Sequence, residues 1–193
     1  EPARVESAPR TLRAAVVEPF REFFGRREAW ALLLLIVLYK LGDAFAGALS
    51  TTFLIRGGGY GPAEVGMVNK VLGLAATIIG ALAGGALMAR LRLYRALMLF
   101  GILQALSNLG YWVVAVAPKN IWVMGAAVGF ENLCGGLGTA AFVALCLGLC
   151  DARFAATQFA LLSALSAVGR TYLAGPLTPV LVGWWGWPGF FLA

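Results

Sequence analysis

The sequence predicts an all-α integral membrane protein with five transmembrane helices and the start of a sixth. Of its 193 residues, 61% are hydrophobic and only 12% are charged, and the mean hydropathy of +0.84 lies far outside the range of soluble domains. Five apolar runs are long enough to cross a hydrocarbon core of about 30 Å as helices. Ionisable residues stand in the middle of three of these runs, where a bilayer tolerates them only if they face water, each other or a ligand.

Residues 1–28 differ in composition from everything that follows. They contain six Arg, five Glu and three Pro, and they lack the apolar core of a signal peptide. We predict a cytoplasmic linker here and a transmembrane domain over residues 29–193. Between Leu12 and Phe24 the apolar residues recur at helical spacing with arginines nearby, which is typical of a short helix on the membrane surface, broken near Pro19. A loosely ordered loop is an equal alternative.

The predicted spans follow one another with short connections. They cover residues 29–55, 65–88, 93–117, 121–150 and 154–182. Turn-forming residues separate several of them, at 57–62, 118–120 and 184–188, and the last of these turns is rich in Trp. A further apolar run begins at Gly189, and the chain does not begin with Met. We therefore expect a piece of a longer protein, made of a linker and most of a six-helix half.

The distribution of arginines predicts the orientation in the membrane. If the spans alternate across the bilayer, one side carries only Arg56 and Lys119, while the other carries Arg4, Arg10, Arg13, Arg21, Arg26, Arg27, Arg90, Arg92, Arg95 and Arg153. Cytoplasmic loops carry an excess of basic residues, so the N-terminus and the loop at 88–93 are predicted to be cytoplasmic. The net charge of +6 thus reflects membrane orientation and does not indicate a nucleic-acid partner.

Three deep ionisable residues mark the predicted site. At a rise of about 1.5 Å per residue, Asp43, Glu131 and Arg170 fall in the central part of their spans. Helical spacing places each of them on a face with other polar or small residues. The three faces are Lys40, Asp43, Gly47 and Ser50, then Ala127, Glu131, Gly135 and Gly138, and finally Ser163, Ser166 and Arg170. We expect these faces to line a cavity.

The same residues could instead serve structure. Lys40 and Asp43 could neutralise one another, and Glu131 could pair with Arg170 to lock two helices together. Gln104 and Asn108, four residues apart, form a hydrogen-bonding stripe that suits a sugar or peptide ligand. Hydrogen bonding between helices is an equal alternative for that stripe.

The sequence does not favour an enzyme. It contains no His and no GxSxG, HExxH or P-loop pattern, so the usual bases, metal ligands and nucleophile settings are missing. Cys134, Cys146 and Cys150 lie in apolar sequence without metal-site spacing, and we predict that they are buried thiols. We expect no cofactor and no metal. The clustering of ionisable groups at one depth also argues against a purely structural scaffold.

Five blocks of the sequence are distinctive: YKLGDAF (39–45), TFLIR (52–56), VGMVNK (65–70), FENLCGG (130–136) and ATQFALLS (156–163). These blocks closely resemble the AmpG-type muropeptide permeases of the major facilitator superfamily. The resemblance implies the C-terminal half of a major-facilitator transporter in the bacterial inner (cytoplasmic) membrane. The spans would correspond to its helices seven to eleven and the start of helix twelve.

The resemblance also implies a function. Such a permease imports GlcNAc-anhydroMurNAc and its peptides for peptidoglycan recycling, driven by protons, and its flux feeds β-lactamase induction and so antibiotic resistance. The implied partners are the muropeptide, protons, the lipid bilayer and an N-terminal six-helix half of the same transporter. The alternative is a major-facilitator carrier of another large anionic solute, such as an acyl-CoA or a sugar phosphate.

The candidate binding residues follow from this interpretation. For substrate they are Lys40, Asp43, Gln104, Asn108, Glu131, Asn132 and Arg170. Arg170 would contact carboxylates of the substrate. Proton coupling requires a deep carboxylate that binds and releases a proton, which leaves Asp43 and Glu131. Glu131 is the better candidate because burial among Gly and Ala favours the neutral acid, whereas Lys40 would hold Asp43 charged.

Overall fold

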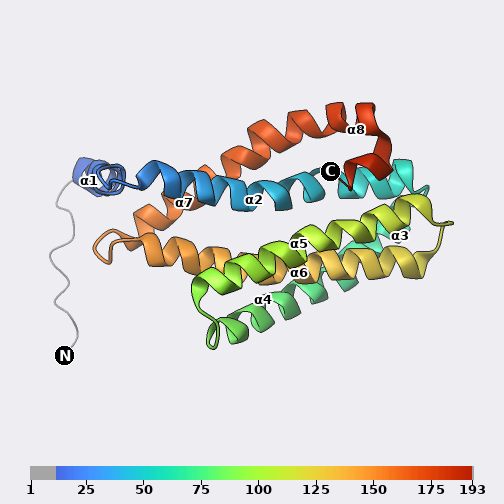
Figure 1. Ribbon diagram of the computed structural model, residues 1–193, viewed down its shortest axis with the longest axis horizontal. Helices are drawn as coiled ribbons and strands as arrows, with labels where there is room; N and C mark the ends of the chain where they lie inside the picture. Colours follow the sequence, from blue (N-terminus) through green and yellow to red (C-terminus); the bar gives the residue numbers. More distant parts are fainter. Residues whose placement is uncertain (1–11, 193) are drawn as a thin grey trace.

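The computed structural model describes residues 12–192, with the side chains of residues 12–15, 42, 43, 46, 48, 169, 170 and 173 excluded. Within these residues the chain is all-helical, with eight α-helices and three short π-helical segments (Figure 1). In chain order the elements are α1 (Leu12–Phe24), α2 (Ala29–Thr52), η1 (Phe53–Gly57), α3 (Pro62–Val68), η2 (Asn69–Gly73), α4 (Leu74–Met88), α5 (Leu93–Val116), α6 (Ile121–Leu149), α7 (Ala155–Val168), η3 (Gly169–Ala174) and α8 (Gly175–Phe190).

The prediction of five helices is wrong as a helix count. α5 and α6 match single predicted spans, but α2 continues into η1, α3 reaches α4 through η2, and α7 reaches α8 through η3. A π-helical turn inserts an extra residue into a helix without ending it, so hydropathy does not detect it. Among the described residues, three continuous helical stretches are long and apolar enough to cross a membrane: Pro62–Met88, Leu93–Val116 and Ile121–Leu149. Shorter apolar helices cover Ala29–Leu41 and Ala155–Val168.

Two helices, α3 and α6, begin where nearby side chains bond backbone N–H groups. α3 starts with Pro62, whose missing N–H costs nothing at a first helical position. The Glu64 carboxylate accepts a hydrogen bond from the Gly61 N–H at 2.8 Å. At α6, the Asn120 side chain accepts from the Trp122 N–H at 2.8 Å. The two turns also bond to each other, because the Tyr60 hydroxyl donates to the Asn120 carbonyl at 3.0 Å.

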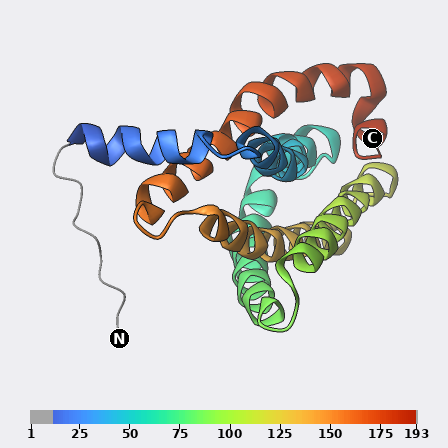
Figure 2. The same cartoon turned by 60° about the vertical axis from the view of Figure 1, so that its left-hand side comes forward.

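Helices α4, α5 and α6 pack together, with α6 in contact with both of the others. α2 packs along α7 and η3 on another side of the molecule, while α8 contacts α5 and α2 (Figure 2). The connections alternate between the two ends of the bundle, as the predicted threading requires. The loops α4–α5 and α6–α7 lie at the end where α2 begins, and the loop α5–α6 lies at the opposite end (Figure 1).

The C-terminal turn predicted at 184–188 is present as a sharp bend within α8. Gly186 has φ 65° and ψ 177°, a backbone conformation that glycine adopts without strain. The bend returns Trp187 and Phe191 to the bundle, where the Phe191 ring lies 4.8 Å from Phe53 and 5.4 Å from Tyr111 between centroids. This aromatic cluster closes one end of the molecule.

Two other predictions concern α1 and the cysteines. The helical interpretation of 12–24 is confirmed, but the predicted break is wrong, because α1 continues through Pro19. Cys134 and Cys146 are buried and Cys150 is half-buried, so the prediction of buried thiols is confirmed for the first two. All three are free cysteines.

The backbones of α4 and α6 approach closely at Gly80 and Gly136, as the small-residue spacing of Gly80 and Gly84 predicts. A Cβ on Gly80 would overlap the Leu133 carbonyl oxygen, which is a backbone atom that cannot rotate away. We expect Gly80→Ala to destabilise the protein by about 1–3 kcal/mol, the usual cost of overpacking. The matched control is Gly85→Ala on the same helix, where a Cβ meets nothing within 4 Å. Thermal unfolding in detergent compares the two, and equal midpoints would contradict this account.

Candidate functional site

Lys40, in the middle part of α2, borders two cavities that lie on different sides of its helix. One cavity, of about 130 Å³, is bounded by α2, α5 and α6, and we call it the α5 cavity. The other, of about 380 Å³, is bounded by α2, α6 and α7, and we call it the α7 cavity. Since a lysine is rarely placed at such a depth in an apolar bundle without a polar surrounding, these cavities form the candidate site.

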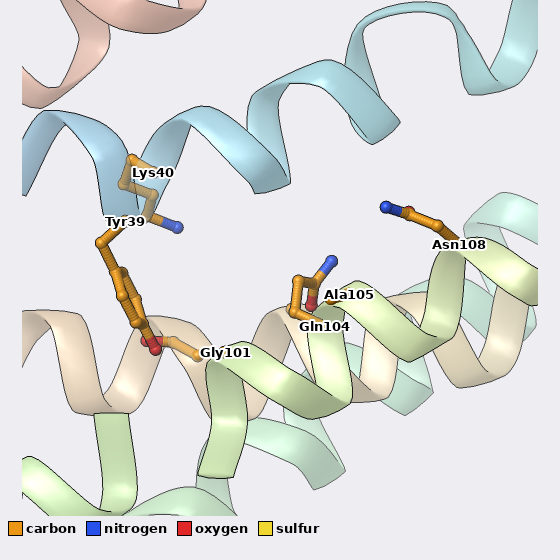
Figure 3. Close-up of a pocket in the computed structure, with 8 residues that line it drawn as sticks. Tyr39, Lys40, Gly101, Gln104, Ala105 and Asn108 are labelled. Carbon is orange, nitrogen blue, oxygen red and sulfur yellow. The ribbon is translucent and has the colours of Figure 1, made fainter. Parts of the chain in front are cut away.

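The α5 cavity contains the predicted amide stripe. Gln104 and Asn108 extend from α5 toward α2, and Tyr39 extends from α2 toward α5 and α6 (Figure 3). Glycines at 101, 135 and 138 leave room for these side chains. The Asn108 Oδ1 atom is buried and has no hydrogen-bond partner among the residues that the structure describes. It is thus an acceptor that a donor on a ligand would satisfy.

The α7 cavity brings two of the three predicted faces together. Lys40 and Gly47 of α2 lie across from Ser163 and Ser166 of α7. The Ser166 hydroxyl donates to the Ser163 carbonyl at 2.7 Å, which satisfies the hydroxyl locally. The polar side chains that line the cavity besides Ser166 are Lys40, Thr139 and Ser163.

Residues of α6 hold the Lys40 ammonium group. Its Nζ donates to the Thr139 hydroxyl at 3.3 Å and lies 5.4 Å from the centroid of the Phe142 ring. The Phe142 ring in turn stacks on Tyr39 with 6.3 Å between centroids. A cation over an aromatic face gains about 0.5–2 kcal/mol, so α6 fixes the charge between the two cavities. Sequence reasoning missed Thr139 and Phe142, although both follow Gly135 at helical spacing.

Glu131 and Asn132 line neither cavity and instead join a hydrogen-bond network between α4, α5 and α6. The Glu131 Oε2 atom accepts from the Tyr111 hydroxyl at 3.4 Å and from Asn132 Nδ2 at 3.0 Å. Asn132 Nδ2 also donates to the Val128 carbonyl at 2.8 Å, and its Oδ1 accepts from the Thr77 hydroxyl at 3.1 Å. The Asn132 amide thus holds Glu131 in place, and the role of Thr77 was missed from sequence.

Asp43 and Arg170 lie outside the residues whose side chains the structure describes. Their backbones belong to α2 and η3, and these two elements contact each other. The binding roles of both residues stay predictions, as do the pairings of Asp43 with Lys40 and of Arg170 with Glu131. The ion pairs recorded among the described side chains, such as Lys119 with Glu64 at 3.7 Å, lie near helix ends.

Apolar helices of spanning length that enclose a lysine and amide side chains define a class of protein, the multi-pass membrane proteins with a polar interior. Comparisons with known proteins narrow this class, although no family model matches the chain. The chain is 62% identical over 192 residues to the anhydromuropeptide permease of Escherichia coli K12, covering 100% of the chain and 39% of that protein. It is 35% identical over 181 residues to a protein named transporter AmpG 4 of Rickettsia felis, covering 92% of the chain and 42% of that protein.

These similarities confirm the predicted resemblance to the AmpG-type permeases over the part of those proteins that the chain spans. That part is less than half the length of these relatives. The names of both relatives describe transport rather than catalysis, in agreement with the prediction that the chain is not an enzyme.

Proposed function

We propose that this chain forms part of the C-terminal half of a secondary transporter that imports anhydromuropeptides into the cytoplasm by proton symport. The observation that carries the proposal is the identity of 62% over the whole chain to an anhydromuropeptide permease. The cavities on both sides of Lys40 support it, because a carrier needs a polar interior that a structural bundle avoids. In the cell this import would serve peptidoglycan recycling and the signal for β-lactamase induction.

The membrane arrangement that we propose is that of a major-facilitator half. Five spans would be formed by α2 with η1, α3 with η2 and α4, α5 alone, α6 alone, and α7 with η3 and α8. Residues 1–28 would form the cytoplasmic linker, and the bend at Gly186 would precede the next span. The protein would lie in the bacterial inner membrane and pair with an N-terminal six-helix half.

The chemistry of the cavities suits a substrate with carboxylates, amides and sugar hydroxyls. Lys40 offers a cation, and the Asn108 Oδ1 atom offers a buried acceptor to an amide N–H or a hydroxyl. Ligand pockets for drug-sized molecules measure about 300–1,000 Å³. The α5 cavity, at about 130 Å³, is smaller than this range, and the α7 cavity, at about 380 Å³, lies at its lower end, so each would hold only part of a disaccharide with a peptide. The remaining contacts would come from the other half of the transporter.

We further propose that Arg170 contacts substrate carboxylates and that Asp43 is a secondary site for proton coupling. Glu131 is the principal candidate for coupling, because Tyr111 and Asn132 hold its carboxylate at a fixed position in the bundle. The motion between outward and inward states would then change whether this carboxylate is protonated.

Uptake by the full-length protein tests the function. Energised right-side-out vesicles containing it should accumulate labelled GlcNAc-anhydroMurNAc-peptide, and unlabelled anhydromuropeptide should compete. Competition by an acyl-CoA or a sugar phosphate but not by anhydromuropeptide would support the other carrier class and reject our proposal.

Cysteine labelling tests the orientation. In a version of the full-length protein without native cysteines, single cysteines at Gly58 and Asn120 should react with an impermeant maleimide from the periplasm, because both lie in turns at the end opposite the α4–α5 loop. A cysteine at Leu91 should react only after the cytoplasmic side is made accessible. The reverse pattern would overturn the topology and the direction of transport with it.

A further inference from the structure

Helix α1 runs crosswise to the bundle at the end where α2 begins. It is seen end-on in Figure 1, where α2, α5 and α6 run across the view, and it extends to one side of the bundle in Figure 2. Its contacts are with α7 and α2. If the long helices cross a bilayer, α1 is therefore oriented along the membrane surface.

The described residues of α1 present three different faces. Pro19 and Phe23 are buried against the bundle, and Glu18 and Arg21 are exposed. A third face carries exposed apolar side chains. At about 100° per residue these side chains share an arc of about 100°, and they are Val16, Val17, Phe20 and Phe24. We call this set the α1 apolar arc. It is an amphipathic pattern of the kind that binds the boundary between headgroups and acyl chains.

The α1 apolar arc is continuous with an exposed apolar surface of α2. Phe20 stacks on Phe24 with 6.3 Å between centroids, and the Phe24 ring lies 5.4 Å from Trp30. Trp30, near the start of α2, is 75% exposed, and the exposed Leu34 and Leu38 follow it along the same helix. The row of rings thus leads from the exposed apolar surface of α2 onto α1, and tryptophan is a residue enriched at the membrane interface.

A buried hydrogen-bond cluster fixes the rotation of α1 about its own axis. Gln158 of α7 is 0% exposed, and its Nε2 donates to the Pro19 carbonyl at 3.2 Å and to Glu22 Oε2 at 2.5 Å. Its Oε1 accepts from the Asp151 N–H at 2.7 Å. Arg26 donates to both Glu22 oxygens, at 3.0 and 2.9 Å, and to the Leu149 carbonyl. We call Glu22, Arg26 and Gln158 the α1 latch.

We propose that α1 is an interfacial helix whose apolar arc inserts into the lipid bilayer surface, and that the α1 latch holds it in that orientation. The partner is the bilayer itself, at the boundary of headgroups and acyl chains, because the arc extends an exposed apolar surface of α2 that begins with Trp30, and exposed tryptophan beside apolar residues is typical of that boundary. Arg21, at the edge of the arc, would reach the phosphates. The proposal depends on the helices crossing a membrane and is independent of which solute is carried.

Fluorescence quenching in the full-length protein tests insertion. With Cys134, Cys146 and Cys150 replaced by alanine, single cysteines at Val17 and Phe20 carry an environment-sensitive dye, and one at Glu18 is the matched control on the water-facing side. In liposomes with brominated acyl chains we expect quenching at Val17 and Phe20 to exceed that at Glu18 by about threefold, with the opposite order for aqueous iodide. Equal iodide quenching at all three positions would overturn the proposal.

A second measurement tests the latch. Gln158→Leu keeps a similar side-chain volume but removes all three hydrogen bonds of the amide. Helix α1 should then lose its fixed rotation, and the difference in lipid quenching between dyes at Val17 and Glu18 should fall by about half or more. Arg27→Gln is the control, because Arg27 is exposed on the same segment. An unchanged difference in Gln158→Leu would reject the latch while leaving insertion intact. Uptake is measured on the same samples, so that failure of the transport proposal is recognised separately.

Discussion

Replacing Lys40 with methionine in the full-length transporter is expected to reduce anhydromuropeptide uptake by about 100-fold, since removing one partner of a charge pair that the bound substrate would bury costs about 2–5 kcal/mol. Methionine keeps the length of the apolar stem and removes the ammonium that bonds Thr139 and lies over Phe142. Initial rates of uptake at low substrate concentration measure the effect, normalised to the amount of protein in the membrane.

Two further variants separate binding from structure at this position. Lys70→Met removes an exposed cation from η2 and should leave uptake within about twofold, because surface charges contribute little. If Lys40 served only to neutralise Asp43, the double variant Lys40→Met with Asp43→Asn would recover uptake and thermal stability together. Such recovery would assign the pair to structure, whereas continued loss of uptake in a stable double variant supports substrate binding.

The predicted ends of the third and fourth spans agree with α5 and α6 to within a residue at each end. The reason is local, because turn-forming sequence at 118–120 and the basic loop before Leu93 stop the apolar runs. The π-helical segments could not be predicted in the same way. An inserted residue changes the register of the helix but not its hydropathy, so η1, η2 and η3 leave no signal in the pattern.

The predicted site was recovered only in part, because the sequence does not show how the helices pack against one another. Helical spacing correctly placed Lys40 and Gly47 on one face and Ser163 and Ser166 on another, and these faces meet at the α7 cavity. Which faces meet depends on packing between helices, which spacing does not determine. Glu131 accordingly lies in the network with Tyr111 rather than in either cavity. The helical path through Pro19 was missed because the contacts that hold α1 are not local: Pro19 is buried against the bundle, and its carbonyl accepts a hydrogen bond from Gln158, far along the chain.

The hydrogen bonds around Glu131 also show why the variant Glu131→Gln keeps the local structure. Glutamine has the size of glutamate, and its carbonyl oxygen can still accept from the Tyr111 hydroxyl and from Asn132 Nδ2. What glutamine cannot do is bind and release a proton. Glu131→Gln therefore separates a role in coupling from a role in packing, whereas Thr77→Val, which removes the hydroxyl that bonds Asn132, tests packing around the carboxylate alone.

We expect Glu131→Gln to abolish uphill accumulation of anhydromuropeptide while downhill exchange across the membrane continues. A symporter must load and unload its proton as the site changes sides, so a residue that cannot titrate uncouples transport from the proton gradient without closing the substrate path. In proteoliposomes of the full-length protein, accumulation under an imposed pH gradient should fall about tenfold or more, to the level of equilibration, with counterflow retained at a substantial fraction of the wild-type rate. Asp43→Asn, measured in parallel, identifies the contribution of the second carboxylate. If the Glu131→Gln protein still concentrates its substrate against a gradient, Glu131 is not the coupling residue, and the acidic residues of the N-terminal half are the ones to test.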